Sequence, residues 1–311
     1  MKSINPIISL VVPVLNEENS IETFLSRIDL VFSKMPIESY EIIFINDGSA
    51  DDTLSRLLAF KAKREFIKII DLSRNFGKEA ALTAGIRYSK GLAVIPIDVD
   101  LQDPPEVIEI MIEKWREGFE VVLGHRVDRD SDIWSKRFFS TWFYKVYNKL
   151  CAVGIPDNVG DFRLMDRSVV DALNTLPESQ RFMKGLFAWV GFKTTSVDYA
   201  RPIRYEGSSK FNFLTLSKLA IEGITSFSIV PLRIFSLIGV LISATSFFFG
   251  SYIVMHVILV GKDVPGYASL VVAVTFLGGL QLMAIGLIGE YMGRAYMETK
   301  RRPIYLVRKI Y

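Results

Sequence analysis

Two long segments near the C-terminus contain no charged residue, and they constrain the fold of this chain more than any other feature. Residues 234–261 and 264–289 hold no Asp, Glu, Lys or Arg over 28 and 26 positions. A helix needs about 20 apolar residues to cross the hydrocarbon core of a bilayer. Buried helices of soluble proteins seldom stay uncharged for so long, and the connector "GKDVP" is short. The two segments therefore predict a hairpin of antiparallel transmembrane helices.

Basic residues flank this hairpin unequally. Arg233 precedes the first segment and six Lys or Arg residues follow the second, whereas the connector holds Lys262 and Asp263. Lys and Arg are enriched in cytoplasmic loops of membrane proteins. We therefore expect both termini, and the whole N-terminal region, to be cytoplasmic. The single cysteine, Cys151, fits a reducing compartment.

The first 125 residues alternate β-rich runs with helical runs. The run "EIIFIN" is followed by "DTLSRLLAFKAK", for example, and "IKIIDL" by "KEAALTAGIRYS". Four such units in a row predict an α/β domain with a mostly parallel, doubly wound sheet. Ligands of these sheets bind at the carboxyl ends of the strands. The polar clusters "NEEN", "NDGS", "SRNFGK" and "DVDLQD" follow the predicted strands and are expected at that edge.

Composition divides the chain into four parts. Charge is concentrated before residue 210, although half of all residues are hydrophobic and 23% are charged. We expect a cytoplasmic α/β domain over 1–210, an interfacial amphipathic helix region over 211–232, a transmembrane hairpin over 233–292 and a basic cytoplasmic tail over 293–311.

Two apolar stripes with basic neighbours, at 136–150 and 211–228, suit the headgroup layer of a membrane, so membrane lipid is an expected partner. Alternatively, either stripe packs on the core of the domain. The net charge of +3 is mild and no nucleic-acid motif is present, so nucleic acid is not an expected partner.

The stretch "VIPIDVDLQD" places three acids at the end of a predicted buried strand. Asp103 is predicted to cap the next helix, because "DPPE" has Glu106 three residues later. Asp98 and Asp100 alternate along an extended segment and so point the same way. Two converging carboxylates predict a divalent cation, Mg²⁺ or Mn²⁺. The alternative is two solvated acids in a loop.

Other strand ends carry groups that suit a nucleoside diphosphate. Asp47 could bond a base or ribose, or it could be a turn residue. Arg74, Asn75 and Lys78 could donate to a diphosphate, or they could be ordinary surface residues. Glu17 could meet a base or simply begin a helix. Around one crevice these groups predict a nucleoside-diphosphate site, and no P-loop or dinucleotide-binding motif is present.

Six motifs, in this order, resemble the family 2 glycosyltransferases that transfer a sugar to a polyprenyl phosphate, which include dolichyl-phosphate mannose synthase. The resemblance is closest to the bactoprenol glucosyltransferases of O-antigen glucosylation and extends through "VPGYASL", "FLGG" and "IGEYMGR" in the predicted spans. The six motifs are "VVPVLNEE", "INDGSADDT", "LSRNFGKEAALTAG", "PIDVDLQDPPE", "GDFRLMDR" and "RFMKGLFAWVGF".

The resemblance implies a GT-A type fold and assigns residues to a site. It makes Asp98 and Asp100 the metal-binding pair, with Gln102 as a further ligand. It places the uridine diphosphate of a UDP-sugar among Pro13, Leu15, Glu17, Asp47 and Val99. Asp161 matches the acid usually assigned as the base; the alternatives are that it orients the acceptor or caps a loop.

The implied reaction is inverting transfer of glucose from UDP-glucose to undecaprenyl phosphate in a bacterial inner membrane. The candidates for holding the acceptor phosphate are Arg126, Arg137, Arg204 and Lys210; the alternative for each is a solvated or snorkelling charge. Another donor, GDP-mannose or a UDP-aminoarabinose derivative, stays open, as does a catalytically inactive membrane scaffold. Small residues in "FLGG" and "IGEYMG" would allow the spans to form a homo-oligomer.

Overall fold

The computed structural model describes residues 7–35, 39–127, 154, 156, 158–179, 181–200, 228–260 and 266–311. The predicted interfacial stripe at 136–150, and that at 211–228 except its last residue, lie outside these residues. The same is true of three predicted acceptor-binding residues, Arg137, Arg204 and Lys210.

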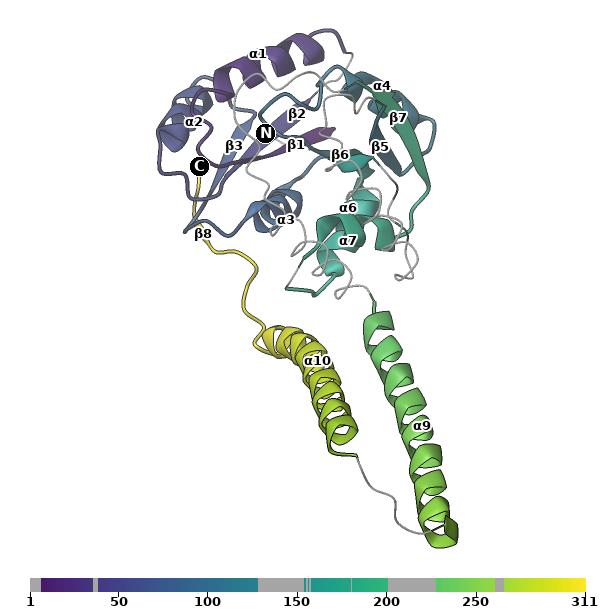
Figure 1. Ribbon diagram of the computed structural model, residues 1–311. Helices are drawn as coiled ribbons and strands as arrows, with labels where there is room; N and C mark the ends of the chain where they lie inside the picture. Colours follow the sequence, from purple (N-terminus) through teal and green to yellow (C-terminus); the bar gives the residue numbers. More distant parts are fainter. Residues whose placement is uncertain are drawn as a thin grey trace.

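An eight-stranded sheet forms the centre of the N-terminal region (Figure 1). Its middle is parallel, because β1 pairs with β2 and β4, and β2 pairs with β3. This part confirms the predicted doubly wound arrangement. The four parallel strands are β1 (Ile8–Val14), β2 (Tyr40–Asn46), β3 (Ile67–Leu72) and β4 (Ala93–Pro96).

The remaining strands make the sheet mixed. Strand β6 lies between β4 and β5 and is antiparallel to both, while β7 pairs with β5 in parallel. The strand order is β7-β5-β6-β4-β1-β2-β3-β8. These strands are β5 (Val121–Arg126), β6 (Val159–Asp166), β7 (Thr194–Tyr199) and β8 (Val307–Ile310).

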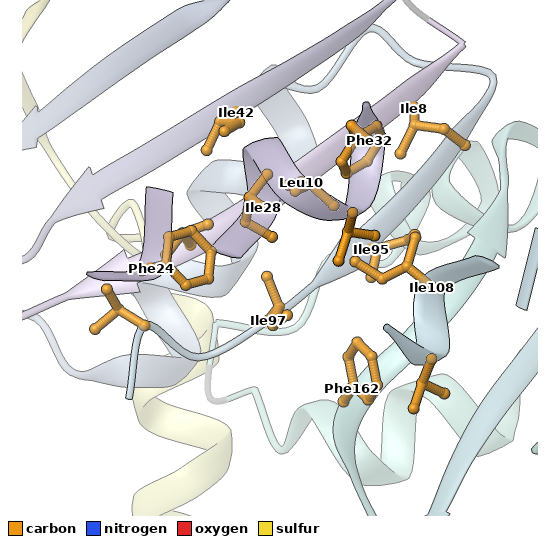
Figure 2. Packing of buried hydrophobic residues seen from close by; sticks show 14 of the residues in the cluster. Ile8, Leu10, Phe24, Ile28, Phe32, Ile42, Ile95, Ile97, Ile108 and Phe162 are labelled. Atoms are coloured by element: carbon orange, nitrogen blue, oxygen red, sulfur yellow. The ribbon is translucent and has the colours of Figure 1, made fainter. Parts of the chain in front are cut away.

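Helices cover both faces of the sheet. Successive strand residues point to opposite faces, so their side chains enter two separate buried clusters. Leu10 of β1 belongs to one buried cluster and its neighbour Val11 to the other. Helices α1, α2 and α4 pack on the first face, where Phe24 and Ile28 of α1 lie over the strands (Figure 2). Helices α3, α6 and α7 pack on the second. The helices are α1 (Ile21–Phe32), α2 (Thr53–Lys61), α3 (Lys78–Tyr88), α4 (Val107–Arg116), α6 (Arg167–Thr175) and α7 (Met183–Trp189).

Helices α9 (Val230–Val260) and α10 (Tyr267–Thr299) project away from the sheet and run antiparallel to each other (Figure 1). Their candidate membrane spans are 24 and 31 residues long and are not buried within the chain. Phe248 is 72% exposed and Leu282 71%. An apolar surface of this extent is unfavourable in water and suits a bilayer core.

The C-terminal segment differs from the basic tail expected over 293–311. Helix α10 continues to Thr299, and Val307–Ile310 form strand β8, which pairs antiparallel with β3 at the edge of the sheet. Four residues, two of them basic, give no recognisable strand pattern, and charged side chains are common on edge strands. The chain therefore leaves the sheet domain for the hairpin and returns to it.

Candidate functional site

The ammonium group of Lys78 connects two acids at the centre of the site. Lys78 is the first residue of α3, and its Nζ lies 2.8 Å from Oδ2 of Asp98 and 3.0 Å from Oδ2 of Asp161. Asp98 follows β4, and Asp161 lies in β6. Because β4 and β6 are neighbours in the sheet, acids 63 residues apart in the chain share one cation.

The charges of this group stabilise one another. Burial disfavours the charged form of Lys78, but Asp98 and Asp161 outweigh it and raise the pKa of Lys78 above its usual value. Burial likewise raises the pKa of Asp161, but Lys78 and Lys184 together bring it below the usual range. Asp161 is therefore an ionised carboxylate at neutral pH.

Glu79 is a member of the site that the sequence analysis missed. Its Oε2 accepts a hydrogen bond from the backbone N–H of Met183, at the start of α7, over 3.1 Å. Burial raises the pKa of Glu79 to about 7, and the negative charge of Asp161 adds to the effect. Two features of the sequence indicate that Glu79 and Lys184 belong to the site: Glu79 directly follows Lys78, and Lys184 lies in the motif "RFMKGLFAWVGF".

Of the predicted metal-binding acids, Asp100 lies in a turn, so the segment from Asp98 to Asp100 is not the extended one expected. Oδ1 of Asp100 accepts the backbone N–H of Gln102 over 3.1 Å, and Leu101 between them has a φ of 57°. Nowhere in the described part of the chain do three or more His, Cys, Asp or Glu side chains gather as metal ligands. Two carboxylates still fit Mg²⁺ or Mn²⁺, which complete their shells with phosphate oxygens and water.

Asp47 holds the loop that follows β3. Its Oδ1 and Oδ2 accept the backbone N–H groups of Phe76 and Gly77 over 2.7 and 2.9 Å. Burial raises the pKa of Asp47, and these hydrogen bonds oppose the shift. Gly48 allows the loop to approach, since a Cβ there would lie 2.6 Å from the nitrogen of Asn75. Asp47 thus positions the predicted diphosphate-binding loop.

The other predicted nucleotide-binding residues lie on the same edge of the sheet. Ser20 Oγ donates to Oε2 of Glu17 over 2.7 Å, so Glu17 contributes to the start of α1. Arg74 stacks over the ring of Phe76, with 4.1 Å from Cζ to the ring centroid. Leu15 is 40% exposed, whereas Val99 is 3% exposed and its side chain belongs to the core. Pro13 is half-buried near the end of β1, and Asn75 is exposed.

Comparison with known proteins identifies the family. Residues 9–173 match the model of the family described as glycosyl transferase family 2. The chain belongs to this family. Among its relatives, an uncharacterized glycosyltransferase of Synechocystis sp. is 50% identical over 300 residues, 96% of this chain and 94% of the relative. The prophage bactoprenol glucosyl transferase homolog of Escherichia coli is 48% identical and covers 97% and 99%. The bactoprenol glucosyl transferase of Shigella phage SfX is 50% identical and covers 97% and 98%.

This family 2 glycosyltransferase has a sheet of the GT-A type. As expected for that fold, Asp98 and Asp100 follow β4, the strand beside β1 at the centre of the sheet. The enzyme class and fold predicted from the six motifs are confirmed.

The interpretation of Asp103 as a helix cap is wrong. Helix α4 begins at Val107, and Asp103 instead accepts hydrogen bonds from Tyr199 of β7 and Arg126 of β5, the latter over 3.2 Å. The Asp103 side chain is 4% exposed. A buried carboxylate requires a partner, and two distant strands supply it. The local sequence contained no sign of either.

In this glycosyltransferase, the side chain of Arg126, a predicted acceptor-binding residue, therefore binds Asp103. Burial lowers the pKa of Arg126, but Asp103 outweighs it and raises the pKa above its usual value. Its Nε also donates to the hydroxyl of Tyr199 over 3.0 Å.

We expect Arg126→Met to lower the free energy of unfolding by about 3 kcal/mol, because Asp103 would stay buried without its cation. Denaturant unfolding in detergent measures the change. Lys114→Met, which breaks an exposed pair with Glu117, is the control and should cost less than about 1 kcal/mol. Unchanged stability together with a raised KM for the acceptor would instead assign Arg126 to the acceptor phosphate.

Proposed function

We propose that this protein transfers glucose from UDP-glucose to undecaprenyl (bactoprenol) phosphate with inversion, for modification of a cell-surface glycan. A phosphate oxygen of the lipid attacks the anomeric carbon, the bond from that carbon to the diphosphate breaks, and UDP leaves. The observation that carries the proposal is Lys78, which connects the acid assigned to the donor, Asp98, with the acid assigned to the acceptor, Asp161. The names of the near full-length relatives support glucose and bactoprenol as the substrates.

The donor side of the proposed site is the edge formed by the ends of β1 to β4. Asp98 and Asp100 would hold Mg²⁺ or Mn²⁺, which would supply Lewis-acid stabilisation to the departing diphosphate. Lys78 adds a fixed positive charge beside the same diphosphate, and the loop 73–77 supplies Arg74 and Asn75 as donors. Asp47 keeps that loop in place through its two backbone hydrogen bonds.

On the acceptor side, the phosphate monoester needs little help from a base. Its second pKa is about 6, so it is largely ionised at neutral pH. Two like charges repel, and the positive charges of Lys78 and Lys184 reduce the repulsion between the phosphate and Asp161. We assign Asp161 to orienting this group of cations toward the acceptor. Arg137, Arg204 and Lys210 stay predictions.

The hairpin brings the site to its lipid substrate. The hydroxyl of Tyr291 in α10 donates to the carbonyl of Ser228 before α9 over 2.6 Å, so the two helices meet at their domain ends. This arrangement and the basic flanks support the proposal of a multi-pass protein of the inner membrane, with the sheet domain and both termini in the cytoplasm. Self-association of the spans stays a prediction.

The proposed function is tested by incubating the purified full chain with Mg²⁺, undecaprenyl phosphate and one labelled sugar nucleotide at a time. We expect label from UDP-glucose to enter the organic phase, and far less label from GDP-mannose or UDP-aminoarabinose derivatives. Reactions without acceptor are the control. Preferred transfer of another sugar would overturn glucose as the substrate, and no transfer from any donor would favour the inactive scaffold.

A further inference from the structure

Strand β8 brings the chain from the membrane hairpin to the proposed donor site. It pairs with β3, and the backbone N–H of Ser73 donates to the carbonyl of Leu306 over 2.9 Å. Ser73 opens the loop 73–77, which carries the predicted diphosphate-binding residues. The C-terminal segment is therefore adjacent to this loop, although it is more than 200 residues away in sequence.

Arg308 of β8 contacts this loop and a buried acid together. Its Nη2 donates to the carbonyl oxygen of Ser73 over 2.7 Å, and its Nη1 lies 3.6 Å from Oδ2 of Asp71. The Asp71 side chain is 1% exposed. A buried carboxylate is costly without a positive partner, and Arg308, whose own side chain is 62% exposed, places a cation beside Asp71.

A series of hydrogen bonds connects Asp71 with residues at the ends of β2 and β1. Asn46, the last residue of β2, donates from Nδ2 to Oδ1 of Asp71 over 2.8 Å. Oδ1 of Asn46 accepts the N–H of Ser49 over 3.2 Å, and Oγ of Ser49 accepts the N–H of Asn16 over 3.0 Å. Oδ1 of Asn16 accepts the N–H of Ala50 over 2.8 Å.

This series of hydrogen bonds ends at a strained backbone position. Asn16 has a φ of 56°, in the left-handed region that costs energy for a residue other than glycine. Asn16 lies between Leu15 and Glu17, two residues predicted to contact the nucleotide. The hydrogen bond that Asn16 N–H donates to Ser49 and the one that Asn16 Oδ1 accepts from Ala50 hold Asn16 in this conformation.

The far end of the segment is fixed as well. The carboxylate of Glu298, in the last turn of α10, accepts the N–H and the hydroxyl of Ser179 over 3.1 and 2.9 Å. Ser179 lies in the sheet domain, shortly before α7. Residues 299–306 therefore connect two attached points, Glu298 on Ser179 and β8 on β3.

We infer that Arg308 is a positioning residue for the donor. It fixes the loop 73–77 directly and the end of β1 through Asp71, Asn46 and Ser49, so the returning C-terminal strand forms part of the support of the nucleotide site. This inference rests on the proposed function, because it takes the ligand at this edge to be a uridine diphosphate.

The test is the affinity for UDP in the presence of Mg²⁺, measured by calorimetry on the full chain in detergent. Arg308→Ala is expected to weaken UDP binding about tenfold, the size typical of coupling within one hydrogen-bond network. The KM for the sugar nucleotide should rise in proportion, while the KM for undecaprenyl phosphate stays unchanged. Arg308→Lys, which keeps the charge, should recover part of the loss.

Lys309→Ala is the matched control, because Lys309 is the next residue of β8 and stacks over Tyr311 instead, with 4.5 Å from Nζ to the ring centroid. It should bind UDP as the wild type does. If Arg308→Ala does not fold, Arg308→Gln takes its place, since it keeps a donor for Ser73 and loses the charge beside Asp71. Wild-type affinity in the folded variant would overturn the inference. Failure of the wild type to bind UDP would overturn the proposed function instead.

Discussion

Replacing Asp98 with Asn is expected to reduce glucosyl transfer at least about a hundredfold, because the departing diphosphate loses a metal-binding carboxylate. The loss should appear in kcat, since charge on the diphosphate grows in the transition state. Lys78 keeps its ion pair with Asp161 at 3.0 Å, so the variant should fold. The measurement is transfer of labelled glucose into the organic phase at saturating substrates.

Asp171→Asn is the control for this prediction. Asp171 lies on α6 with its side chain 66% exposed, and it pairs with Arg167 at 3.7 Å. The control should keep wild-type activity. Asp100→Asn should behave as Asp98→Asn does. Full activity in both of these variants would remove the metal from the proposed mechanism and leave Lys78 as the cation at the diphosphate.

The features predicted from the sequence are those that a local pattern determines. The absence of charge over 234–261 and 264–289 predicted α9 and α10, because nothing but a bilayer readily accommodates so much exposed apolar surface. The alternation of strand and helix patterns before residue 125 predicted the parallel centre of the sheet. The motif containing Asp98 and Asp100 predicted their place at the end of β4, and the structure has them there.

The features that were missed depend on contacts between distant segments. Asp103 looked like a cap because its neighbours are two prolines and a glutamate, yet its partners lie on β5 and β7. Strand β8 is four residues long and exists because β3 offers an unpaired edge. Arg126 looked like a free cation for the same reason: its partner, Asp103, is 23 residues away.

The position of Lys78 depends on both a local pattern and a contact between distant segments. Its place after a predicted strand indicated a donor to a diphosphate, but its position between Asp98 and Asp161 required the insertion of β6 beside β4. That insertion is antiparallel and was not predicted. In the proposed site, a cation shared by both acids couples the donor side to the acceptor side, so a change at either acid alters the charge available at the other.

Replacing Asp161 with Asn is expected to lower kcat by about a hundredfold or more, because the cations Lys78 and Lys184 lose the carboxylate that orders them. Asp98 still holds Lys78 at 2.8 Å, so the fold should persist. Single-turnover transfer in the presence of saturating UDP-glucose measures the effect. The control is Asp198→Asn, which should leave the rate unchanged. Asp198 lies on β7 and its side chain is 67% exposed.

The pH dependence of this defect separates two roles for Asp161. A general base is needed most where the acceptor phosphate still carries a proton, below its second pKa of about 6. The pKa of Asp161 lies below its usual range, so the carboxylate accepts a proton poorly. We therefore expect the ratio of wild-type to variant rates to be the same on both sides of that pKa. A ratio that is large below it and falls toward one above it would show that Asp161 removes the proton. Equal rates of the wild type and the variant at every pH would show that Asp161 has only a structural role.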